Sequence, residues 1–316
     1  MVRICSLLPS TTEIVFALGK GDRLVGVTHE CDFPTQAANL PKVTRSTIPG
    51  GFSSSEIDSA VSKALVEVGS LYDLDLDLLE QLQPDIVLTQ RLCDVCAVSY
   101  DHVQEVARQL SSQPKVINVE PHSLNDILAS VLTVGAAVGA EREANTLHEN
   151  LRRRIDAIGQ KMAGPGYRPR VLCLEWVDPP FCGGHWMKEL VQIAGGRDDI
   201  AVLHRPSKRI KWESIHDFAP EVIVFTCCGF DLRRCAVEGE NLAKMKKVQE
   251  LPAVKNGRVY ATDGSAYFSR PGPRIVESLE ILAHLIHPER FPAPRLEGAF
   301  TSISLAPREA EPLRQL

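Results

Sequence analysis

Residues 123–162 read SLNDILASVLTVGAAVGAEREANTLHENLRRRIDAIGQKM. Apolar and polar residues alternate there with the period of a helix, and nothing in the stretch indicates a β-strand. Three consecutive arginines at 152–154 suit the solvated face of a helix, and the run GPG at 164–166 ends the pattern. We therefore predict a long helix over about residues 141–162, which divides the chain into two halves.

On both sides of this helix, short apolar runs that end in turn residues alternate with amphipathic stretches. This alternation is typical of doubly wound sheets, in which helices connect parallel strands. The predicted strands span residues 2–8, 24–28, 86–89, 116–119, 171–175, 222–226 and 259–262. The predicted helices on either side span residues 12–18, 55–68, 76–82, 98–110, 186–194 and 274–286.

The predicted fold class is therefore α/β, with two doubly wound lobes joined by one long inter-lobe helix. The boundaries that we predict are 1–140 for the N-terminal lobe, 141–166 for the helix, 167–288 for the C-terminal lobe and 289–316 for a C-terminal extension. The extension is rich in proline and in charges of both signs, which is typical of a loosely attached tail.

The composition is that of an ordinary globular protein, with 44% hydrophobic and 24% charged residues. A net charge of -5 and a pI near 6.0 argue against nucleic-acid binding. No run approaches the roughly 20 apolar residues that span a bilayer, so we expect no membrane insertion. The first residues, MVRICSLLP, are too soon interrupted by proline for a signal peptide. We therefore expect a cytoplasmic protein, or a periplasmic one if the sequence is trimmed.

In open α/β sheets, ligands bind outside the carboxyl ends of the strands. Six loops of this chain occupy that position, and they hold two of the three tryptophans and most of the cysteines. The loops are residues 9–12, 29–34, 90–96, 176–186, 227–230 and 263–273. In such a fold, the loops of the two lobes that hold these tryptophans and cysteines face one another, so we predict a ligand-binding cleft.

Five motifs, found in order between about residues 2 and 287, carry a family resemblance. They are SLLPSTTE at 6–13, LQPDIV at 82–87, DPPF at 178–181 with Gly184, KWE at 211–213 and SRPGPR at 269–274. The ordered set resembles the class III solute-binding proteins, which have a rigid inter-lobe helix and serve ABC importers of vitamin B12, siderophores and haem. Within that class, the motifs resemble the vitamin B12-binding component most.

The resemblance implies a lobe–helix–lobe protein that flexes only slightly and is not an enzyme. It implies a corrinoid held edge-in between aromatic side chains, which suit a broad apolar macrocycle with few polar groups at its rim. It also implies Phe181 and Trp212 as ring contacts, joined by Tyr267 or Phe268; for Trp212, core packing is the alternative. The complete set of predicted ligand-binding residues is Pro9, Ser10, His29, Glu30, Asp32, Arg91, Glu175, Trp176, Phe181, His185, Trp186, Trp212, Tyr267 and Phe268.

Cysteine and histidine residues form a candidate metal site in the first lobe. Cys93 and Cys96 have the spacing of a structural zinc pair. His29 and Cys31 follow another strand of the same sheet, so we expect all four side chains to lie together, where they could hold zinc or ligate cobalt. The alternative is that the thiols are structural or contact the rim of the ligand. His185, which follows two glycines, is favoured as a rim hydrogen-bond donor over a lower axial ligand of a metal-centred macrocycle.

We predict a solute-binding protein that holds a cobalamin-like corrinoid in the cleft, with haem or another metal chelate as the alternative of the same class. An alternative of a different class is a metal-dependent or thiol-redox enzyme that uses the cysteine and histidine cluster. The sequence has no GxSxG elbow, no GxGxxG after the first strand and no HExxH helix, which argues against three common enzyme classes. Without a visible signal peptide, we expect no contact with a periplasmic permease, and a monomer or weak dimer.

Overall fold

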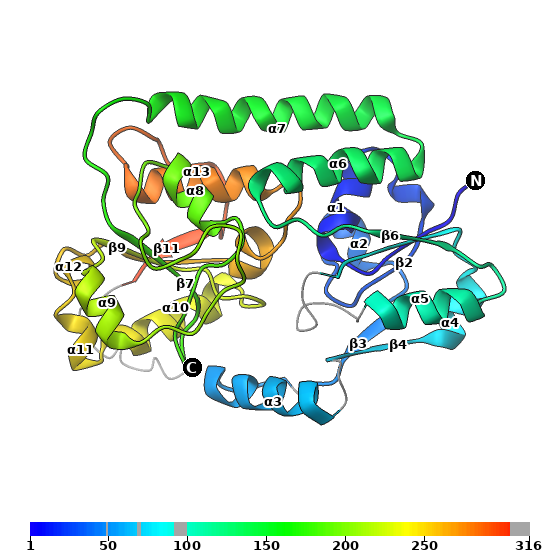
Figure 1. Cartoon of the computed structure of the whole chain (residues 1–316), viewed down its shortest axis with the longest axis horizontal. Coiled ribbons are helices and arrows are strands. Elements are labelled where there is room, and N and C mark those ends of the chain that lie inside the picture. The colour runs from blue at the N-terminus through cyan, green and yellow to red at the C-terminus, as the bar shows by residue number, and fades with distance from the viewer. Residues whose placement is uncertain (49, 68–70, 92–99, 304–316) are drawn as a thin grey trace, which may run out of the picture. The chain divides into compact units, whose positions relative to one another are not determined.

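The structure, a computed structural model, describes residues 1–48, 50–67, 71–91 and 100–303 (Figure 1). The chain divides into two compact units. The first unit comprises Met1–Ala163, Leu203–Arg205 and Arg270–Leu279. The second unit comprises Gly164–Val202, Pro206–Ser269 and the described residues from Glu280 onward. The first unit therefore takes in a segment from near the end of the sequence.

The first unit contains a sheet of four parallel strands. Their order is β2 (Leu24–Val27), β1 (Ile4–Ser6), β5 (Ile86–Thr89) and β6 (Lys115–Asn118). Every residue of β1 and of β5 is buried, as expected for parallel strands covered by helices on both faces. The strands predicted in this half of the chain are confirmed, with small shifts at their ends.

Helices α1 (Pro9–Ala17), α4 (Leu76–Leu82) and α5 (Tyr100–Gln109) connect these strands, as predicted. Val103, Val106 and Leu110 recur at the period of a helix and pack, together with Leu79 of α4, against Cys5 of β1. This apolar stripe explains why α5 lies on the sheet. Two short elements, η1 (Gly21–Arg23) and α2 (Thr35–Ala38), were not predicted.

An antiparallel pair of strands, β3 (Thr44–Ser46) and β4 (Tyr72–Leu74), was also not predicted. Between them lies α3 (Ser54–Glu67), which was predicted. The register joins Thr44 to Leu74. Both strands are short and contain charged residues, so no alternation of apolar residues marks them in the sequence.

Residues 123–162 form two helices and no strand, which confirms the prediction. α6 (Leu124–Val138) begins after Ser123, whose hydroxyl accepts a hydrogen bond from the Asp126 main-chain N–H in a capping box. Gly139 ends α6 in the left-handed conformation, at φ 65°, and α7 (Glu141–Lys161) follows. The predicted long helix is α7, and α6 packs alongside it (Figure 1).

The second unit contains a mixed sheet. Its three central strands, β10 (Val259–Thr262), β9 (Val222–Phe225) and β7 (Val171–Trp176), are parallel and were predicted. Two antiparallel edge strands, β8 (Phe181–Cys182) and β11 (Phe300–Ser302), were not. β11 lies in the predicted extension. That part of the extension is therefore bound to the sheet rather than loosely attached, because Ala299 and Ile303 on either side of β11 are buried.

Two helices of the second half, α8 (Met187–Ile193) and α13 (Ile275–Ile286), were predicted. The elements that were not predicted are α9 (Trp212–Phe218), α10 (Leu232–Ala243), α11 (Lys246–Gln249), α12 (Pro252–Lys255) and the π-helical turn η2 (Gly264–Phe268). The fold class is confirmed as α/β, with parallel strands at the centre of the main sheet of each unit. Within the described ranges, no helix has the length and apolar character needed to cross a membrane.

Candidate functional site

The carboxyl ends of β1 and β2 are joined directly, and buried hydroxyl groups lie behind them. The Thr28 main-chain N–H donates to the Ser6 carbonyl at 3.0 Å. The Thr12 hydroxyl donates to Ser6 Oγ at 2.8 Å, and both side chains are fully buried. This part of the SLLPSTTE motif is therefore structural. Of the two ligand-binding residues predicted here, Ser10 is buried and Pro9 is partly exposed.

Two arginines from the segment that precedes α13 contact Glu13 of α1. Arg274 Nη2 lies 2.6 Å from Glu13 Oε1, and Arg274 Nε donates to Glu13 Oε2 at 2.9 Å, which makes a bidentate pair. Arg270 Nη1 lies 3.4 Å from Glu13 Oε1. Only 2% of the Glu13 side chain and 7% of the Arg270 side chain are exposed. These charges are therefore buried together, and removal of one would leave an unpaired charge in the interior.

Arg270 also fixes the loop that follows β2. Its Nη1 lies 2.5 Å from Asp32 Oδ1, and its Nη2 donates to Asp32 Oδ2 and to the Glu30 carbonyl, both at 3.1 Å. Burial acts to raise the pKa of Asp32, but the hydrogen bonds and charge of Arg270 outweigh it and hold that pKa below 3.8. The predicted ligand-binding residue Asp32 is thus an ion-pair partner whose side chain remains 66% exposed.

His29, which follows β2, is held by β3 and β4. Its Nδ1 lies 2.7 Å from Thr44 Oγ1, and that oxygen accepts the His29 main-chain N–H at 3.0 Å. The Tyr72 ring packs on the imidazole with 5.4 Å between centroids, and the Tyr72 hydroxyl donates to Glu30 Oε1 at 3.2 Å. Burial lowers the pKa of His29 below 6.5, so the ring is largely neutral at pH 7. His29 and Glu30, both predicted ligand-binding residues, are partly exposed neighbours.

Cys31 lies in the core of the first unit, as the alternative of a structural thiol implies. Its Sγ lies 3.1 Å from Thr12 Oγ1, only 2% of the residue is exposed, and burial raises the pKa of Cys31 to about 11. A small thiol packs like an apolar side chain, which explains the inward orientation. Cys93 and Cys96 lie outside the described residues. Among the residues that are described, no group of three or more histidines, cysteines and carboxylates could hold a metal ion, so zinc gains no support.

Arg91, another predicted ligand-binding residue, follows β5. Its guanidinium lies 3.8 Å from Asp101 Oδ2 and 6.0 Å from the centre of the Tyr100 ring. Both charged side chains of this pair are largely exposed, and such a pair contributes little to stability. Arg91 is therefore an accessible cation at the carboxyl-end edge of the first sheet.

In the second unit, Glu175 near the end of β7 is bound by the chain around it. The Gly184 main-chain N–H donates to Glu175 Oε1 at 2.8 Å. Burial raises the pKa of Glu175 above its usual value, against the effect of hydrogen bonds from Gly184 and Ser207. A Cβ added at Gly184 would lie 2.2 Å from the Ser207 main-chain nitrogen, so only glycine fits here. The predicted ligand-binding residue Glu175 is thus a half-buried support of this loop.

Aromatic side chains gather at the carboxyl end of β7. Trp176 and Phe181 pair across β7 and β8, and both are partly exposed. Trp176 packs on Phe230 with 4.9 Å between ring centroids. The Arg234 guanidinium lies 3.7 Å from the centre of the Phe230 ring, within cation–π range. This edge therefore offers aromatic surface together with a cation.

Trp186 and Phe268, both predicted as ligand contacts, instead pack in the core of the second unit. They are 5% and 2% exposed, and Trp186 Nε1 donates to the Phe268 carbonyl at 3.2 Å. His185 stacks on Trp186 with 5.5 Å between centroids and is partly exposed, as is Tyr267. In η2, Tyr267 is therefore the aromatic residue that remains accessible.

Trp212, at the first turn of α9, has a different partner. Lys247 Nζ of α11 lies 4.3 Å from the centre of its ring. One face of the indole is thus covered by a cation, and the residue is half-buried. Trp212 is therefore neither a core residue nor fully exposed, and its predicted contact with the ligand stays a prediction.

Several residues of these edges were not predicted from the sequence. Phe230 lies in the loop after β9, which was predicted to contribute to the site. The position of this loop at the end of a strand is the feature of the sequence that could have identified Phe230. Arg234 lies in α10, which was not predicted. Thr44 and Tyr72 reach His29 through β3 and β4, and no local pattern announces contacts between such distant parts of a sequence.

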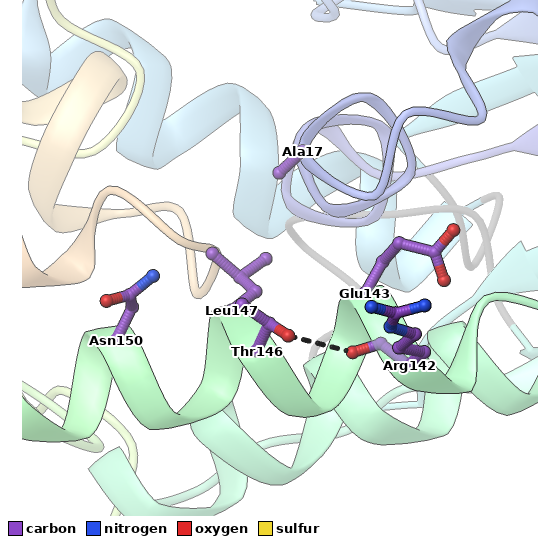
Figure 2. A pocket seen from close by; sticks show the side chains of 6 residues that line it. All are labelled: Ala17, Arg142, Glu143, Thr146, Leu147 and Asn150. Atoms are coloured by element: carbon purple, nitrogen blue, oxygen red, sulfur yellow. Dashed lines mark hydrogen bonds between the residues drawn. The ribbon is translucent and has the colours of Figure 1, made fainter.

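A depression with a volume of about 430 Å³ lies elsewhere on the first unit (Figure 2). It is lined by Ala17 of α1 and by Arg142, Glu143, Thr146, Leu147 and Asn150 of α7. α1 starts at the carboxyl end of β1, so Ala17, its last residue, lies toward the opposite edge of the sheet. The Thr146 hydroxyl donates to the Arg142 carbonyl at 3.1 Å, and Glu143 pairs with Lys20 at 3.1 Å. The depression is not at the predicted site.

Two α/β units with aromatic and charged residues at the carboxyl ends of their strands are the arrangement that is expected of a solute-binding protein. Residues 4–266 match the family of periplasmic binding proteins, and the chain belongs to that family. The chain is 25% identical over 299 residues to YvrC, an ABC transporter substrate-binding lipoprotein of Bacillus subtilis (strain 168), covering 92% of this chain and 81% of the relative. It is 22% identical over 284 residues to the vitamin B12-binding protein of Vibrio parahaemolyticus, covering 89% and 88% of the two chains.

A solved structure has the same fold. The periplasmic heme-binding protein RhuT from Roseiflexus sp. RS-1, in its apo form, gives a TM-score of 0.69 at 21% identity and covers 91% of this chain and 98% of that chain. The family resemblance and the prediction of a protein that is not an enzyme are confirmed, since the family consists of substrate-binding proteins. The expected cytoplasmic location gains no support, because the Bacillus relative is by name a lipoprotein.

Proposed function

We propose that the chain binds a cobalamin-like corrinoid through residues at the carboxyl-end edges of its sheets. The observation that carries this proposal is the pair of partly exposed aromatic side chains on the second sheet, Trp176 and Phe181. Trp176 packs on the buried ring of Phe230, which the Arg234 guanidinium also contacts. A corrin ring is broad and largely apolar, with amide groups at its rim. Rigid aromatic faces cover such a ring, and a few charged or polar groups orient it.

The first sheet has polar groups at its own carboxyl-end edge. His29, Glu30, Asp32 and Arg91 follow β2 and β5 and are all at least partly exposed. They supply an imidazole, carboxylates and a guanidinium, which can hydrogen-bond to the amides of a corrin rim. The relative that is named as a vitamin B12-binding protein supports a corrinoid as the ligand. Haem is the alternative within the same class, because imidazole suits iron as well as cobalt.

Replacing Trp176 by alanine is expected to weaken corrinoid binding by about tenfold or more, since truncation of an aromatic anchor removes about 2 kcal/mol. Calorimetric titration with hydroxocobalamin measures the effect. Tyr167→Ala is the matched control, because Tyr167 is an aromatic residue of the second unit that is 68% exposed and precedes β7, at the opposite end of that strand. Equal affinities of the two variants would show that Trp176 does not contact the ligand.

The class of ligand is tested by gel filtration after incubation with cobalamin, cobinamide or haem, followed by an absorption spectrum of the protein peak. Colour retained with either corrinoid is the expected result. Colour retained with haem alone would show that the ligand is haem and not a corrinoid. No retained colour and no calorimetric heat with any of the three would contradict the proposed function.

A further inference from the structure

The imidazole of His29 is fixed at one of its two nitrogens. Nδ1 lies 2.7 Å from Thr44 Oγ1 and 3.5 Å from Thr28 Oγ1, and the two hydroxyls lie 2.8 Å apart. Both threonines are buried, and the Tyr72 ring packs against the imidazole. Within the described part of the chain, Nε2 makes no hydrogen bond. One nitrogen is therefore anchored in the protein, and the other has no hydrogen bond in a residue that is partly exposed.

The two threonines can set the tautomer of this ring. The Thr44 oxygen already accepts the His29 main-chain N–H at 3.0 Å. If Thr44 donates its own hydrogen to Thr28, the 2.7 Å contact requires that Nδ1–H of the ring donates to Thr44. Nε2 then carries a lone pair and no hydrogen. This is the arrangement of histidines that bind metals, which donate their second ring N–H to a neighbouring oxygen.

We propose that Nε2 of His29 coordinates the metal ion at the centre of the bound macrocycle. The inference rests on the proposed function and adds the class of ligand that fits best: a cobalt or iron macrocycle with an exchangeable axial position. A single protein ligand suffices, because the ring supplies the equatorial nitrogens. The neighbouring thiol does not compete, since Cys31 is buried against Thr12.

The sharpest probe is cob(II)inamide, a corrinoid that lacks the nucleotide base of cobalamin. Its unpaired electron lies along the axial direction, so an axial nitrogen splits the electron paramagnetic resonance signal. Bound to the wild-type protein, it is expected to show a triplet splitting, which becomes a doublet when the histidines carry nitrogen-15. This measurement needs no variant, so it does not depend on whether a substitution preserves the fold.

Variants then show which residue supplies the axial nitrogen. His29→Ala is expected to retain cobinamide with lower affinity and without the splitting, and His29→Gln serves if the alanine variant is unstable. Thr44→Val, which removes the group that holds Nδ1, is expected to weaken binding by about 10–100-fold. His102→Ala is the matched control, because His102 is exposed on α5, and it should behave as the wild type.

The outcomes separate this inference from the proposed function. Bound cob(II)inamide without nitrogen splitting in the wild type would overturn the coordination and leave corrinoid binding in place. Splitting that persists in His29→Ala would also overturn it, since another nitrogen would then be the ligand. Failure of the wild-type protein to bind any metal macrocycle would overturn the proposed function and the coordination together.

Discussion

Glu13→Gln is expected to lower the free energy of unfolding of the first unit by about 3–5 kcal/mol, because it removes one partner of a buried charge network. Arg270 and Arg274 would then lie in the interior against a neutral amide. Asp32, which is largely exposed, would be the remaining carboxylate on Arg270. The effect should extend to the loop after β2, since Arg270 holds both Asp32 and the Glu30 carbonyl in place.

Urea unfolding followed by far-ultraviolet circular dichroism measures this loss. Tryptophan fluorescence is a poor probe of it, because all three tryptophans lie in the second unit. Glu143→Gln is the matched control, since Glu143 also pairs with a cation, Lys20, but its side chain is 48% exposed. Screening by water should leave the control close to the wild type. Equal unfolding curves for the two variants would show that the buried network does not stabilise the unit.

Gly184→Ala is expected to destabilise the second unit by about 3 kcal/mol or more, at the upper end of what overpacking costs. The new Cβ would lie 2.2 Å from the Ser207 main-chain nitrogen and 2.9 Å from the main-chain carbon of Pro206. Main-chain atoms cannot rotate away as a flexible side chain can. The substitution would also displace the N–H that donates to Glu175, so the aromatic group beside it should bind ligand more weakly.

Here tryptophan fluorescence is the appropriate measurement, because Trp176 and Trp186 flank the altered loop. The control is Gly166→Ala, since a Cβ at Gly166 meets no atom within 4 Å. That variant should unfold at the same urea concentration as the wild type or slightly above it. A Gly184→Ala protein that unfolds together with the control would mean that the loop moves aside at little cost.

The central strands were predictable because each is an apolar run that ends at a turn. In β9 and β5, for example, every residue is buried, so the whole strand reads as apolar. α10 was missed because charged residues and Gly239 interrupt its pattern. That glycine is needed where the helix crosses Phe225, since a Cβ there would lie 2.9 Å from the Phe225 ring. A packing requirement of the folded protein therefore obscures a local signal.

The candidate site was predictable only in part, for a similar reason. The rule on carboxyl ends of strands selected the loops that hold His29, Asp32 and Trp176. It could not say which side chains turn inward, as Cys31 and Trp186 do, because that depends on partners supplied by other segments. Asp32 illustrates this limit of sequence-based prediction, because its partner Arg270 lies 238 positions further along the chain.

The network around Glu13 also sets an order of events during synthesis. Glu13 leaves the ribosome early, whereas Arg270, which lies 257 positions later, is made only after most of the second unit. Because synthesis proceeds at about 5–20 residues per second, Arg270 is added on the order of ten seconds or more after Glu13. During that interval the nascent first unit holds a carboxylate in α1 without these two cations. Completion of the first unit is thus a late step of biosynthesis. A truncated chain that ends after α7 would lack the two arginines that complete the network around Glu13.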